Sequence, residues 1–507
     1  MRRQRLHLID LCHDIIEIPT EIQKIVVTGL AVDSNRVIAG NLFFAITGNH
    51  HDGRDFVGDA IAAGAIGVVT GREALTNHIA VLMRGTNIPV IHCDNPRHVM
   101  AKMAARYWPS QPEMIAAVTG TNGKTSTTEF LRQLWQRATW PAVAVGTLGI
   151  TGTETVKTKG EIFSLPPLTT PDSISLHKTI DPLAKAGITH LAFEASSHGL
   201  AQHRLDGMNI HIAGFTNLSR DHLDHHQNMD NYFAAKLRLF VDLLSEGGSA
   251  AINLDDPCGP RIITALKDRA VVVKTFGFNK DSDFHITSIT PSNDGLTMRV
   301  MYKNQNWDIP LALSGTFQAI NALTAAVMGY LGGLPLHDSL GAIPYLKAAT
   351  GRMQAVHGHP RGARIVVDYA HTPDAIAAAL GALRPEATGK LTVLFGCGGD
   401  RDPSKREMMG QIASQIADHV IVTDDNPRTE DPAKIRKAIL KGCGKALEVV
   451  PRDKAIREAL IQLDTGDMLL IAGKGHETAQ LIGNETLPFN DVSVAKNQIR
   501  EMQEAAE

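Results

Sequence analysis

The chain has 507 residues, several times the size of a typical single domain, so its length predicts two to four domains. Hydrophobic residues make up 43% and charged residues 20% of the chain, which is ordinary for a soluble globular enzyme. The net charge of −3 and the lack of a long basic run exclude general binding to nucleic acid.

The cysteines and the amino-terminal segment are informative about the cellular compartment in which the protein is expected. Five cysteines, at positions 12, 93, 258, 397 and 443, show no CxxC spacing, and we expect them to be reduced thiols. The basic opening is not expected to be a signal peptide, because Asp10, His13 and Asp14 interrupt its apolar stretch. No stretch reaches about 18 uninterrupted apolar residues, so no membrane-spanning helix is predicted. The sequence therefore predicts a cytoplasmic protein.

Short β-branched runs that end in glycine-rich turns recur along the chain, with helical patterns between them. Continuous apolar strands followed by helices are typical of parallel sheets covered on both faces, so the predicted fold class is α/β. In such sheets, ligands bind at the carboxyl ends of the strands. The predicted strands lie within residues 64–71, 114–125, 188–199, 363–374, 391–402, 419–428 and 468–477.

Two stretches mark domain boundaries. Around Trp108–Pro112 a helical pattern stops before a new strand, and around residues 349–352 another helix ends before a β-rich segment. The sequence therefore predicts three domains, at residues 1–110, 111–349 and 350–507.

Residues 118–125 read VTGTNGKT, follow a predicted strand and open a predicted helix. Glycines let backbone N–H groups approach phosphate oxygens, and the helix N-terminus adds positive potential. Lys124 is predicted to reach the outer phosphates of ATP and Thr125 to ligate Mg²⁺. Val118 stands where the strict GxxxxGK[ST] pattern has glycine, so a plain strand-to-helix turn is the alternative. Since the strand, the GK[ST] residues and the helix are all in place, we favour the ATP site.

An acidic residue and three histidines follow the next predicted strands. Glu194 ends the run HLAFE, where a Walker B carboxylate would hold Mg²⁺. His222, His225 and His226 have a spacing that would also suit zinc, but no cysteine or further histidine in the sequence nearby completes a tetrahedral shell. We interpret one histidine as a ligand of a second Mg²⁺, and exposed loop histidines are the alternative for His225 and His226.

The segment 232–240, YFAAKLRLF, is predicted to be a helix. Phe233, Leu237 and Phe240 share one face of it, and Lys236 lies at the edge of that face. On these residues alone, the favoured interpretation is a lysine whose stem covers apolar surface while its ammonium stays in solvent.

Ten motifs occur in a fixed order along the chain: TGTNGKT, EASSHGL, NLSRDHLD, YFAAK, GTFQAINA, GRM, DYAHTPD, GDRD, DNPR and GKGHE. Together they resemble the Mur ligases across almost the whole sequence. The resemblance implies an N-terminal UDP-binding domain, a central P-loop ATPase with a parallel sheet and a Rossmann-like C-terminal domain. It also implies an ADP-forming acid–amino-acid ligase of peptidoglycan precursor synthesis. Such an enzyme would add 2,6-diaminopimelate to a UDP-linked muramoyl dipeptide through an acyl phosphate.

The resemblance also assigns roles to individual residues. The catalytic set would be Lys124, Lys236, Glu194 and His222. Lys236 would be carbamylated and would hold Mg²⁺ together with Thr125, Glu194 and His222. The implied ATP contacts are Gly120, Thr121, Asn122, Gly123, Lys124, Thr125, Ser126, Asn321 and Arg352. The implied contacts to the UDP-muramoyl dipeptide are Val32, Ser34, Asn49, His50, His51, Thr169, Thr170, Ser196, Gln202 and Arg204. The implied diaminopimelate pocket consists of Arg401, Asp425, Asn426, Pro427, Arg428, Gly473 and Glu477.

The residue types of this pocket have a physical reading of their own. Diaminopimelate differs from lysine by a carboxylate beside its distal amine, and Arg428 offers a fork for bidentate carboxylate binding. Glu477 and Asp425 can accept hydrogen bonds from an ammonium group. The alternative for the DNPR segment is a helix start, with Asn426 as the cap and Pro427 as the first helical residue. Both interpretations can hold at once.

Three other functions are compatible with some of these residues. The alternatives are a lysine-adding ligase, a ligase similar to folylpolyglutamate synthetase, and a non-catalytic sensor of UDP precursors. The DNPR motif, the Asp33–Ser34 pair and the set of catalytic residues argue against these in turn. Asn35 replaces the usual arginine of the family's Asp-Ser-Arg motif, Arg406 and Glu407 stand where Arg-Pro is common, and residues 153–165 have the character of a small insertion. We expect a monomer with small-molecule substrates only.

Overall fold

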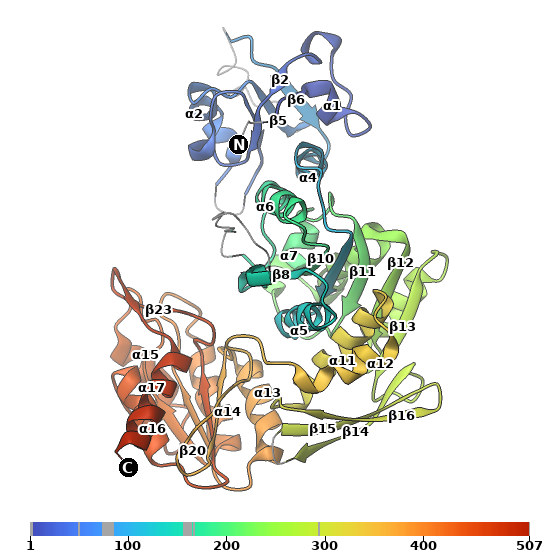
Figure 1. The fold of residues 1–507 in the computed structure, drawn as a ribbon. Coiled ribbons are helices and arrows are strands. Elements are labelled where there is room, and N and C mark those ends of the chain that lie inside the picture. The colour runs from blue at the N-terminus through green and yellow to red at the C-terminus, as the bar shows by residue number, and fades with distance from the viewer. Residues whose placement is uncertain are drawn as a thin grey trace. The chain divides into compact units, whose positions relative to one another are not determined.

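The computed structural model describes residues 4–48, 51–72, 86–155, 165, 168–292 and 295–505. The chain folds into two compact units, coloured along the chain in Figure 1. This division by packing does not decide the three predicted domain boundaries, which remain a prediction. The first unit comprises Met1–Lys124, Thr139–Ile252 and Asp256–Val273, and the second comprises Thr125–Ala138, Asn253–Asp255 and Lys274–Glu507.

A small parallel sheet with the strand order β3-β4-β5-β6 begins the first unit. Strand β4 (Asn41–Ala45) is buried along its whole length, as expected for an apolar strand packed on both faces. The other elements of this part are β1 (Leu6–His7), α1 (Leu8–Cys12), η1 (Thr20–Ile22), β2 (Val26–Val27), β3 (Gly29–Ala31), η2 (Ser34–Arg36), η3 (Gly53–Phe56), α2 (Val57–Ala62), β5 (Gly67–Gly71), β6 (Val90–Cys93) and α4 (Pro96–Tyr107).

The larger sheet of the first unit has the strand order β9-β8-β10-β7-β11-β12. Strand β7 (Met114–Thr119) pairs in parallel with β10 and with β11, placing Val118 opposite Glu194 and Thr119 opposite Phe215. The carboxyl ends of these three strands therefore meet at one edge. The remaining elements are β8 (Ala142–Gly146), β9 (Gly149–Thr151), η5 (Thr153–Thr155), α6 (Ser173–Lys185), β10 (His190–Glu194), α7 (Ser197–Ala201), β11 (Ile210–Phe215), α8 (Leu223–His226), α9 (Met229–Arg238), the π-helix η6 (Leu239–Leu243), β12 (Leu244–Asn253) and α10 (Cys258–Leu266).

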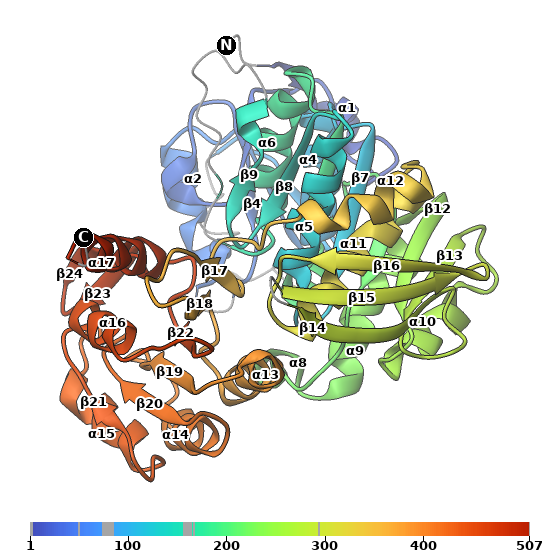
Figure 2. The ribbon, with the colours of Figure 1, turned by 60° about the horizontal axis from the view of Figure 1, so that its bottom comes forward.

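The second unit begins with helix α5 (Lys124–Arg137), which directly follows the glycine loop. Its strands β14, β15 and β16 form an antiparallel set, visible as long arrows in Figure 2. The elements of this part are β13 (Val272–Gly277), β14 (Phe284–Ser292), β15 (Gly295–Tyr302), β16 (Gln305–Leu311), α11 (Thr316–Leu331), α12 (Leu336–Gly341) and η7 (Ile343–Tyr345).

The second unit also holds a six-stranded sheet with the order β17-β18-β22-β19-β20-β21, parallel except for β17. Its register places Asp368 opposite Ala472 and Phe395 opposite Val422. The loops after β18, β22, β19 and β20 therefore leave one edge together. The elements are β17 (Gln354–Val356), β18 (Arg364–Asp368), α13 (Pro373–Leu383), η8 (Arg384–Glu386), β19 (Leu391–Phe395), α14 (Lys405–Ile416), β20 (His419–Val422), α15 (Pro432–Leu440), β21 (Leu447–Glu448), α16 (Arg452–Ile461), β22 (Met468–Ala472), β23 (Ala479–Ile482), β24 (Glu485–Pro488) and α17 (Asp491–Glu504).

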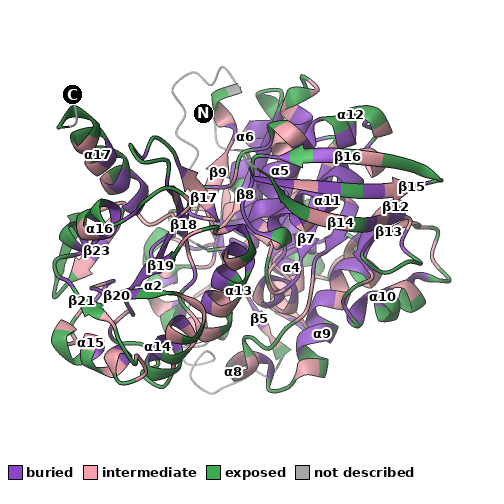
Figure 3. Ribbon diagram, turned by 90° about the horizontal axis from the view of Figure 1, so that it is seen from below, coloured by how far each residue is buried: buried purple, intermediate pink, exposed green. Residues whose placement is uncertain are grey.

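Apolar side chains cover both faces of the six-stranded sheet. Val366 and Leu470 belong to one apolar cluster, whereas their neighbours Ile365 and Leu469 belong to another. Because successive side chains of a strand point to opposite faces, the two clusters lie on the two sides of the sheet. In Figure 3 the strands near β7 are largely purple (buried), whereas α15 and α16 combine buried residues with half-buried and exposed ones.

The predicted α/β class is confirmed, and each of the predicted strand segments contains a strand that pairs in parallel with a neighbour. No helix in the part of the chain that the structure describes combines the length and hydrophobicity needed to span a bilayer.

Candidate active site

The glycine loop between β7 and α5 passes closely over the end of β11. A Cβ atom on Gly120 would lie 1.9 Å from Thr216 Oγ1, and Gly123 has a φ of +87°, so both positions require glycine. The backbone of the loop is held by the residues that follow β11. Thr121 N–H donates to Asn217 O (2.8 Å), and Asn122 N–H donates to Asn217 Oδ1 (3.0 Å). The loop is therefore fixed to the neighbouring strand end.

Two lysines approach the carbonyl groups of this loop. Lys124 Nζ donates to Gly120 O at 3.0 Å and to Thr121 O at 2.8 Å, and Lys236 Nζ, from helix α9, donates to Gly120 O at 2.6 Å. Lys236 is 1% exposed, so its interpretation as a surface lysine with a solvated ammonium is wrong. Burial holds the pKa of Lys236 well below its usual value, and the nearby charge of Lys124 lowers it further.

Glu194 lies at the carboxyl end of β10, next to the end of β7. Its side chain is buried, Oε1 accepts the N–H of Thr147 at 2.8 Å, and Oε2 accepts the Thr147 hydroxyl at 3.2 Å. A Cβ atom on Gly146 would lie 2.2 Å from Oε1, so the glycine at the end of β8 makes room for the carboxylate. Thr147 thus orients the acidic group that the sequence placed at a Mg²⁺ site.

The predicted dipeptide contacts of this region gather around Glu194. The Thr170 hydroxyl lies 2.8 Å from Glu194 O and accepts the N–H of Ser196 at 3.0 Å. Arg204 donates from Nη1 to Thr170 O and from Nη2 to Gln202 Oε1 (2.8 Å), and Thr169 Oγ1 lies 3.2 Å from Thr147 Oγ1. Partial burial lowers the pKa of the Arg204 guanidinium. The structure therefore brings Thr169, Thr170, Ser196, Gln202 and Arg204 together.

The histidines after β11 form a cluster with a fourth histidine that the sequence reasoning did not include. The His198 ring contacts those of His222, His225 and His226 in edge-on or tilted orientations, with ring centroids 4.8, 4.1 and 5.4 Å away. Burial and the neighbouring imidazoles lower the pKa of His198 to about 4. His222 itself is exposed and has a left-handed backbone (φ +53°) just before α8.

A second histidine group joins α4 to the segment after α7. Among the described residues, His98, His203 and Asp206 are the group whose ligand atoms all lie within 4.8 Å of one another. Asp206 Oδ2 accepts from His98 Nδ1 at 2.7 Å and from His203 Nδ1 at 2.6 Å, and Arg238 also binds its carboxylate. Asn95 caps α4 with Oδ1, so its Nδ2 faces His203 Nε2 at 2.9 Å. These hydrogen bonds account for the cluster without a metal ion.

The predicted uridine-side residues lie in the N-terminal part of the first unit. Val32 packs at the margin of its apolar core, and Ser34 begins the short helix η2, which Asp33 caps through a bond to Asn35 N (3.0 Å). His51 is exposed, and its carbonyl accepts the N–H of Gly48 at 2.9 Å. Asn49 and His50 lie outside the described residues, as does most of the predicted insertion.

The remaining predicted ATP contacts belong to the second unit. Thr125 and Ser126 are buried in the first turn of α5. Asn321 on α11 is buried and donates to Gln318 Oε1 at 3.1 Å, and Gln318 in turn donates to Arg352 O at 3.0 Å. The Arg352 guanidinium lies 4.7 Å from the centre of the Tyr369 ring. Gln318, which the sequence reasoning did not single out, therefore connects Asn321 to Arg352.

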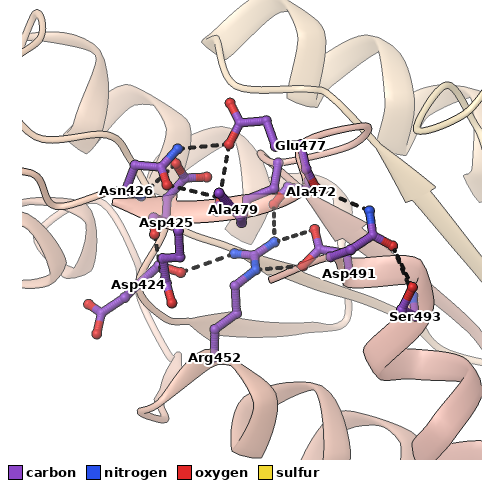
Figure 4. A network of polar contacts seen from close by, with 12 residues as sticks. Asp424, Asp425, Asn426, Arg452, Ala472, Glu477, Ala479, Asp491 and Ser493 are labelled. Carbon is purple, nitrogen blue, oxygen red and sulfur yellow. Dashed lines mark hydrogen bonds and ion pairs between the residues drawn. The ribbon is translucent and has the colours of Figure 1, made fainter. Parts of the chain in front are cut away.

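The loops after β20 and β22 form a polar network at the edge of the six-stranded sheet (Figure 4). Asn426 Nδ2 donates to Glu477 Oε2 at 2.7 Å, and Asp425 Oδ1 accepts the N–H of Asn426 at 2.7 Å. A Cβ atom on Gly473 would lie 2.6 Å from Asp425 Oδ2. Asp425, Asn426, Gly473 and Glu477 are thus brought together.

Arg428 and Pro427 lie against the loop after β19. Arg428 Nη1 donates to Gly399 O at 2.8 Å, and a Cβ atom on Gly399 would lie 2.0 Å from Pro427 O. A Cβ atom on Gly398 would lie 3.0 Å from Arg428 Nη1 and 3.8 Å from Cγ of the exposed Arg401. The glycines of this loop therefore allow the two arginines to lie near each other.

The alternative interpretation of the DNPR segment as a helix start is wrong. Helix α15 begins at Pro432 and is capped by Asp431. Arg428 instead has a left-handed backbone (φ +51°) and bridges to Ile482, donating its N–H to Leu481 O at 3.0 Å. This pairing with Leu481 and Ile482, which are remote in the sequence, overrides the local helix-start pattern.

A buried ion pair supports these loops from beneath. Arg452 and Asp491 are both fully buried, and the guanidinium bonds both carboxylate oxygens, at 2.7 and 2.8 Å. Arg452 also donates to Asp424 O (3.2 Å) and to Ala472 O (2.9 Å), the carbonyls that precede Asp425 and Gly473 (Figure 4). The sequence reasoning missed this pair because neither residue lies in a recognisable motif.

The fold and the glycine loop define the chain as a nucleotide-binding α/β protein with a second polar site on a separate parallel sheet. Comparisons with known proteins identify it further. The Mur ligase family, catalytic domain, matches residues 26–108, the Mur ligase middle domain matches 118–329, and the Mur ligase, glutamate ligase domain, matches 351–475.

Similar proteins cover nearly the whole chain. UDP-N-acetylmuramoyl-L-alanyl-D-glutamate–2,6-diaminopimelate ligase of Bradyrhizobium diazoefficiens is 45% identical over 96% of this chain and 97% of its own. The protein of the same name from Brucella melitensis is 42% identical over 93% and 94%. A solved structure of a ligase with this name has a TM-score of 0.72 at 33% identity, covering 99% of this chain and all of that one. The chain belongs to the Mur ligase family and is an ATP-dependent ligase.

A substitution in the glycine loop should disable nucleotide binding without unfolding the protein. Gly120→Ala places a methyl group against Thr216, so ATP affinity should fall at least about tenfold, or ~1.4 kcal/mol. Isothermal titration calorimetry measures the affinity, and circular dichroism checks the fold. Gly381→Ala on α13 is the matched control, because its methyl group would meet no atom within 4 Å. An unchanged affinity in Gly120→Ala would contradict the assignment of the phosphate loop.

Proposed function

We propose that this ligase joins 2,6-diaminopimelate to the D-glutamyl carboxylate of UDP-N-acetylmuramoyl-L-alanyl-D-glutamate, in peptidoglycan precursor synthesis. The observation that carries the proposal is the set of polar side chains on the loops after β19, β20 and β22. Asn426 bonds the carboxylate of Glu477, and Arg428, two residues further on, bonds Gly399 O. A guanidinium suits a carboxylate and Glu477 suits an ammonium, which are the two distal groups of diaminopimelate. The names of the similar ligases support the same substrate.

The reaction joins a carboxylate to an amine and is uphill in water. The γ-phosphoryl group of ATP would pass to the substrate carboxylate, giving an acyl phosphate and ADP. The amino group then attacks the acyl carbon, loses a proton and expels inorganic phosphate through a tetrahedral intermediate. The protein must bring mutually repelling anions together, so positioning and charge compensation supply most of the catalysis. Lys124 and the N–H groups of the glycine loop would compensate the phosphate charge.

Mg²⁺ fits the side chains that the sequence assigned to it. Glu194 is a buried carboxylate oriented by Thr147, and carboxylate oxygens are ligands that Mg²⁺ prefers. Thr125, His222 and the modified Lys236 would complete the set of ligands. Bound Mg²⁺ would neutralise phosphate oxygens and polarise the phosphoryl group.

The environment of Lys236 supports its carbamylation. Burial lowers the pKa of Lys236, which favours the uncharged, nucleophilic form of the amine. Attack of Nζ on the carbon of CO₂, with loss of one proton, would give a carbamate whose single negative charge is shared by two oxygens. Lys124 lies near enough to compensate this new charge, because it shares Gly120 O as a hydrogen-bond acceptor with Lys236.

The alternatives differ in what the pocket must bind. A lysine-adding enzyme has no use for Arg428, since lysine lacks the distal carboxylate. Folylpolyglutamate synthase of Mycobacterium tuberculosis has a TM-score of 0.58 at 17% identity, over 79% of this chain and 94% of its own, a likeness of fold alone. A non-catalytic sensor would need neither Lys236 nor a pocket for an amino acid.

The proposed function also includes a compartment, an oligomeric state, three domains and further substrate contacts. We propose that the protein acts as a cytoplasmic monomer with a UDP-substrate domain at 1–110, an ATP-binding domain at 111–349 and an amino-acid-binding domain at 350–507. The uridine end would contact Val32, Ser34, Asn49, His50 and His51. Asn321 and Arg352 would contact the nucleotide, and Arg401, Pro427 and Gly473 would line the amino-acid pocket.

The activity is tested by phosphate release coupled to a colour reaction. Phosphate should appear only when ATP, Mg²⁺, the UDP-muramoyl dipeptide and diaminopimelate are all present. Release that proceeds equally well with lysine would favour the lysine-adding alternative. Binding of the UDP precursor without phosphate release under any condition would favour the sensor.

Lys236 should be essential in a way that only an anion can replace. Lys236→Ala should lose at least about a hundredfold in kcat, and added short-chain carboxylates should restore part of it by replacing the carbamate. Lys236→Arg keeps a positive charge and cannot be carbamylated, so it should be inactive. Lys178→Arg, on the exposed side of α6, serves as the matched control. An active Lys236→Arg enzyme would rule out the carbamate.

Arg428 should discriminate between the two amino acids. In Arg428→Ala, kcat/KM for diaminopimelate should fall about a hundredfold, because its distal carboxylate would lose a bidentate, charge-assisted partner. The rate with lysine should change far less, and Arg428→Lys should recover the discrimination only in part. Steady-state kinetics with both amino acids measures the ratio, with Arg457→Ala, an exposed arginine on α16, as the control. Equal losses for both amino acids would make Arg428 structural.

A further inference from the structure

A buried lysine, Lys474, lies beside Asn426 and Glu477 of the proposed amino-acid pocket. Lys474 follows β22 and has a relative exposure of 0%. Its three donors each have an acceptor: Asn426 Oδ1 at 2.9 Å, Glu477 Oε2 at 2.9 Å and Ala479 O at 2.8 Å. An ammonium group has three N–H donors, so its hydrogen-bonding capacity is fully used.

Two of the three acceptors are side chains of the proposed amino-acid pocket. Asn426 Oδ1 also accepts the N–H of Leu481 (3.0 Å), which leaves its Nδ2 to donate to Glu477 Oε2 at 2.7 Å. Lys474 and Asn426 therefore hold the same oxygen of Glu477 from two directions. The other oxygen, Oε1, remains available to accept a hydrogen bond from a ligand.

The charge of Lys474 matters as much as its geometry. Glu477 keeps 29% of its side chain exposed, whereas the lysine has none. The ion pair with a buried lysine restricts the rotation of this partly exposed carboxylate. A carboxylate held in one orientation is what an incoming ammonium group needs as a partner.

Arg452 offers a contrast within the same network. Apart from its ion pair with Asp491, it donates to main-chain carbonyls, those of Asp424 and Ala472 (Figure 4). It therefore supports the backbone of the two loops. Lys474, in contrast, bonds side chains that face the pocket.

We propose that Lys474 is a positioning residue for the incoming amino acid, acting through Glu477 to fix the carboxylate that receives the ligand's ammonium group. This inference rests on the proposed function of the pocket. Lys474 touches no reacting atom, so its effect should fall on binding of the amino acid and leave the ATP and UDP-substrate sites unaffected.

Lys474→Met keeps the length of the side chain and removes its charge. KM for diaminopimelate should rise about tenfold, while KM for ATP and for the UDP-muramoyl dipeptide stays within about twofold of wild type. Lys454→Met, an exposed lysine of α16, is the matched control and should leave all three values unchanged. A similar loss in all three substrates, or none in any, would overturn the inference.

A buried lysine can also support folding, so thermal melts accompany the kinetics. If Lys474→Met does not fold, Lys474→Gln replaces it, since a neutral amide retains donors for Asn426 and Glu477. Its KM for diaminopimelate should then lie between those of wild type and Glu477→Gln. A folded Lys474→Gln enzyme with a wild-type KM would overturn the inference.

A double-mutant cycle with Glu477→Gln separates this inference from the function beneath it. If Lys474 acts through Glu477, the double variant should be no worse than Glu477→Gln alone in its KM for diaminopimelate. Additive losses would show that Lys474 acts elsewhere, and would overturn the inference while the pocket stands. If Glu477→Gln itself leaves this KM unchanged, the pocket assignment fails and the inference fails with it.

Discussion

The proposed ATP site depends on a lysine that is buried beneath the glycine loop, away from water. Lys236 Nζ donates to Gly120 O, and its burial makes the charged form costly. An ordinary buried lysine would be a liability here, because it adds positive charge under a loop that already holds Lys124. The conflict is resolved if the amine is the precursor of an anion. The buried geometry then supports both the phosphate loop and the metal site.

The two polar sites are built by the same constraint. In each sheet, neighbouring parallel strands end at the same edge, so the loops that follow them lie close together. Loops that converge this closely leave no room for side chains at certain points. Gly120 against Thr216 and Gly399 against Pro427 are such points, where backbone passes backbone or a hydroxyl. Glycine in these motifs therefore serves packing between loops as well as access for ligands.

The sequence predicted the strands well because apolar β-branched runs bounded by glycine report local structure directly. The pattern of its own helix predicted a solvated ammonium for Lys236, and this was wrong. The carbonyl that the ammonium contacts, Gly120 O, lies 116 residues earlier in the sequence. The DNPR segment was ambiguous for the same reason, since its pairing partner at Ile482 is remote. Lys474 and Gln318 lie inside GKGHE and GTFQAINA, but the sequence predicted no role for either, and Thr147 stands outside every motif. The sequence did not reveal the tertiary contacts of these residues, which decide their roles.

The Arg452–Asp491 pair has a consequence for how the proposed amino-acid pocket can respond to ligands. One guanidinium bonds the carbonyls at the roots of two loops, after β20 and after β22, and is itself locked by a buried carboxylate. Because the same guanidinium is bonded to both loops, a shift of one loop alone would break some of these hydrogen bonds. An inhibitor that displaces the DNPR loop must therefore also displace the GKGHE loop. The free energy needed to fit a poorly matched ligand then includes the cost of moving both loops. Selectivity in such a pocket comes from stiffness as well as from the groups it displays.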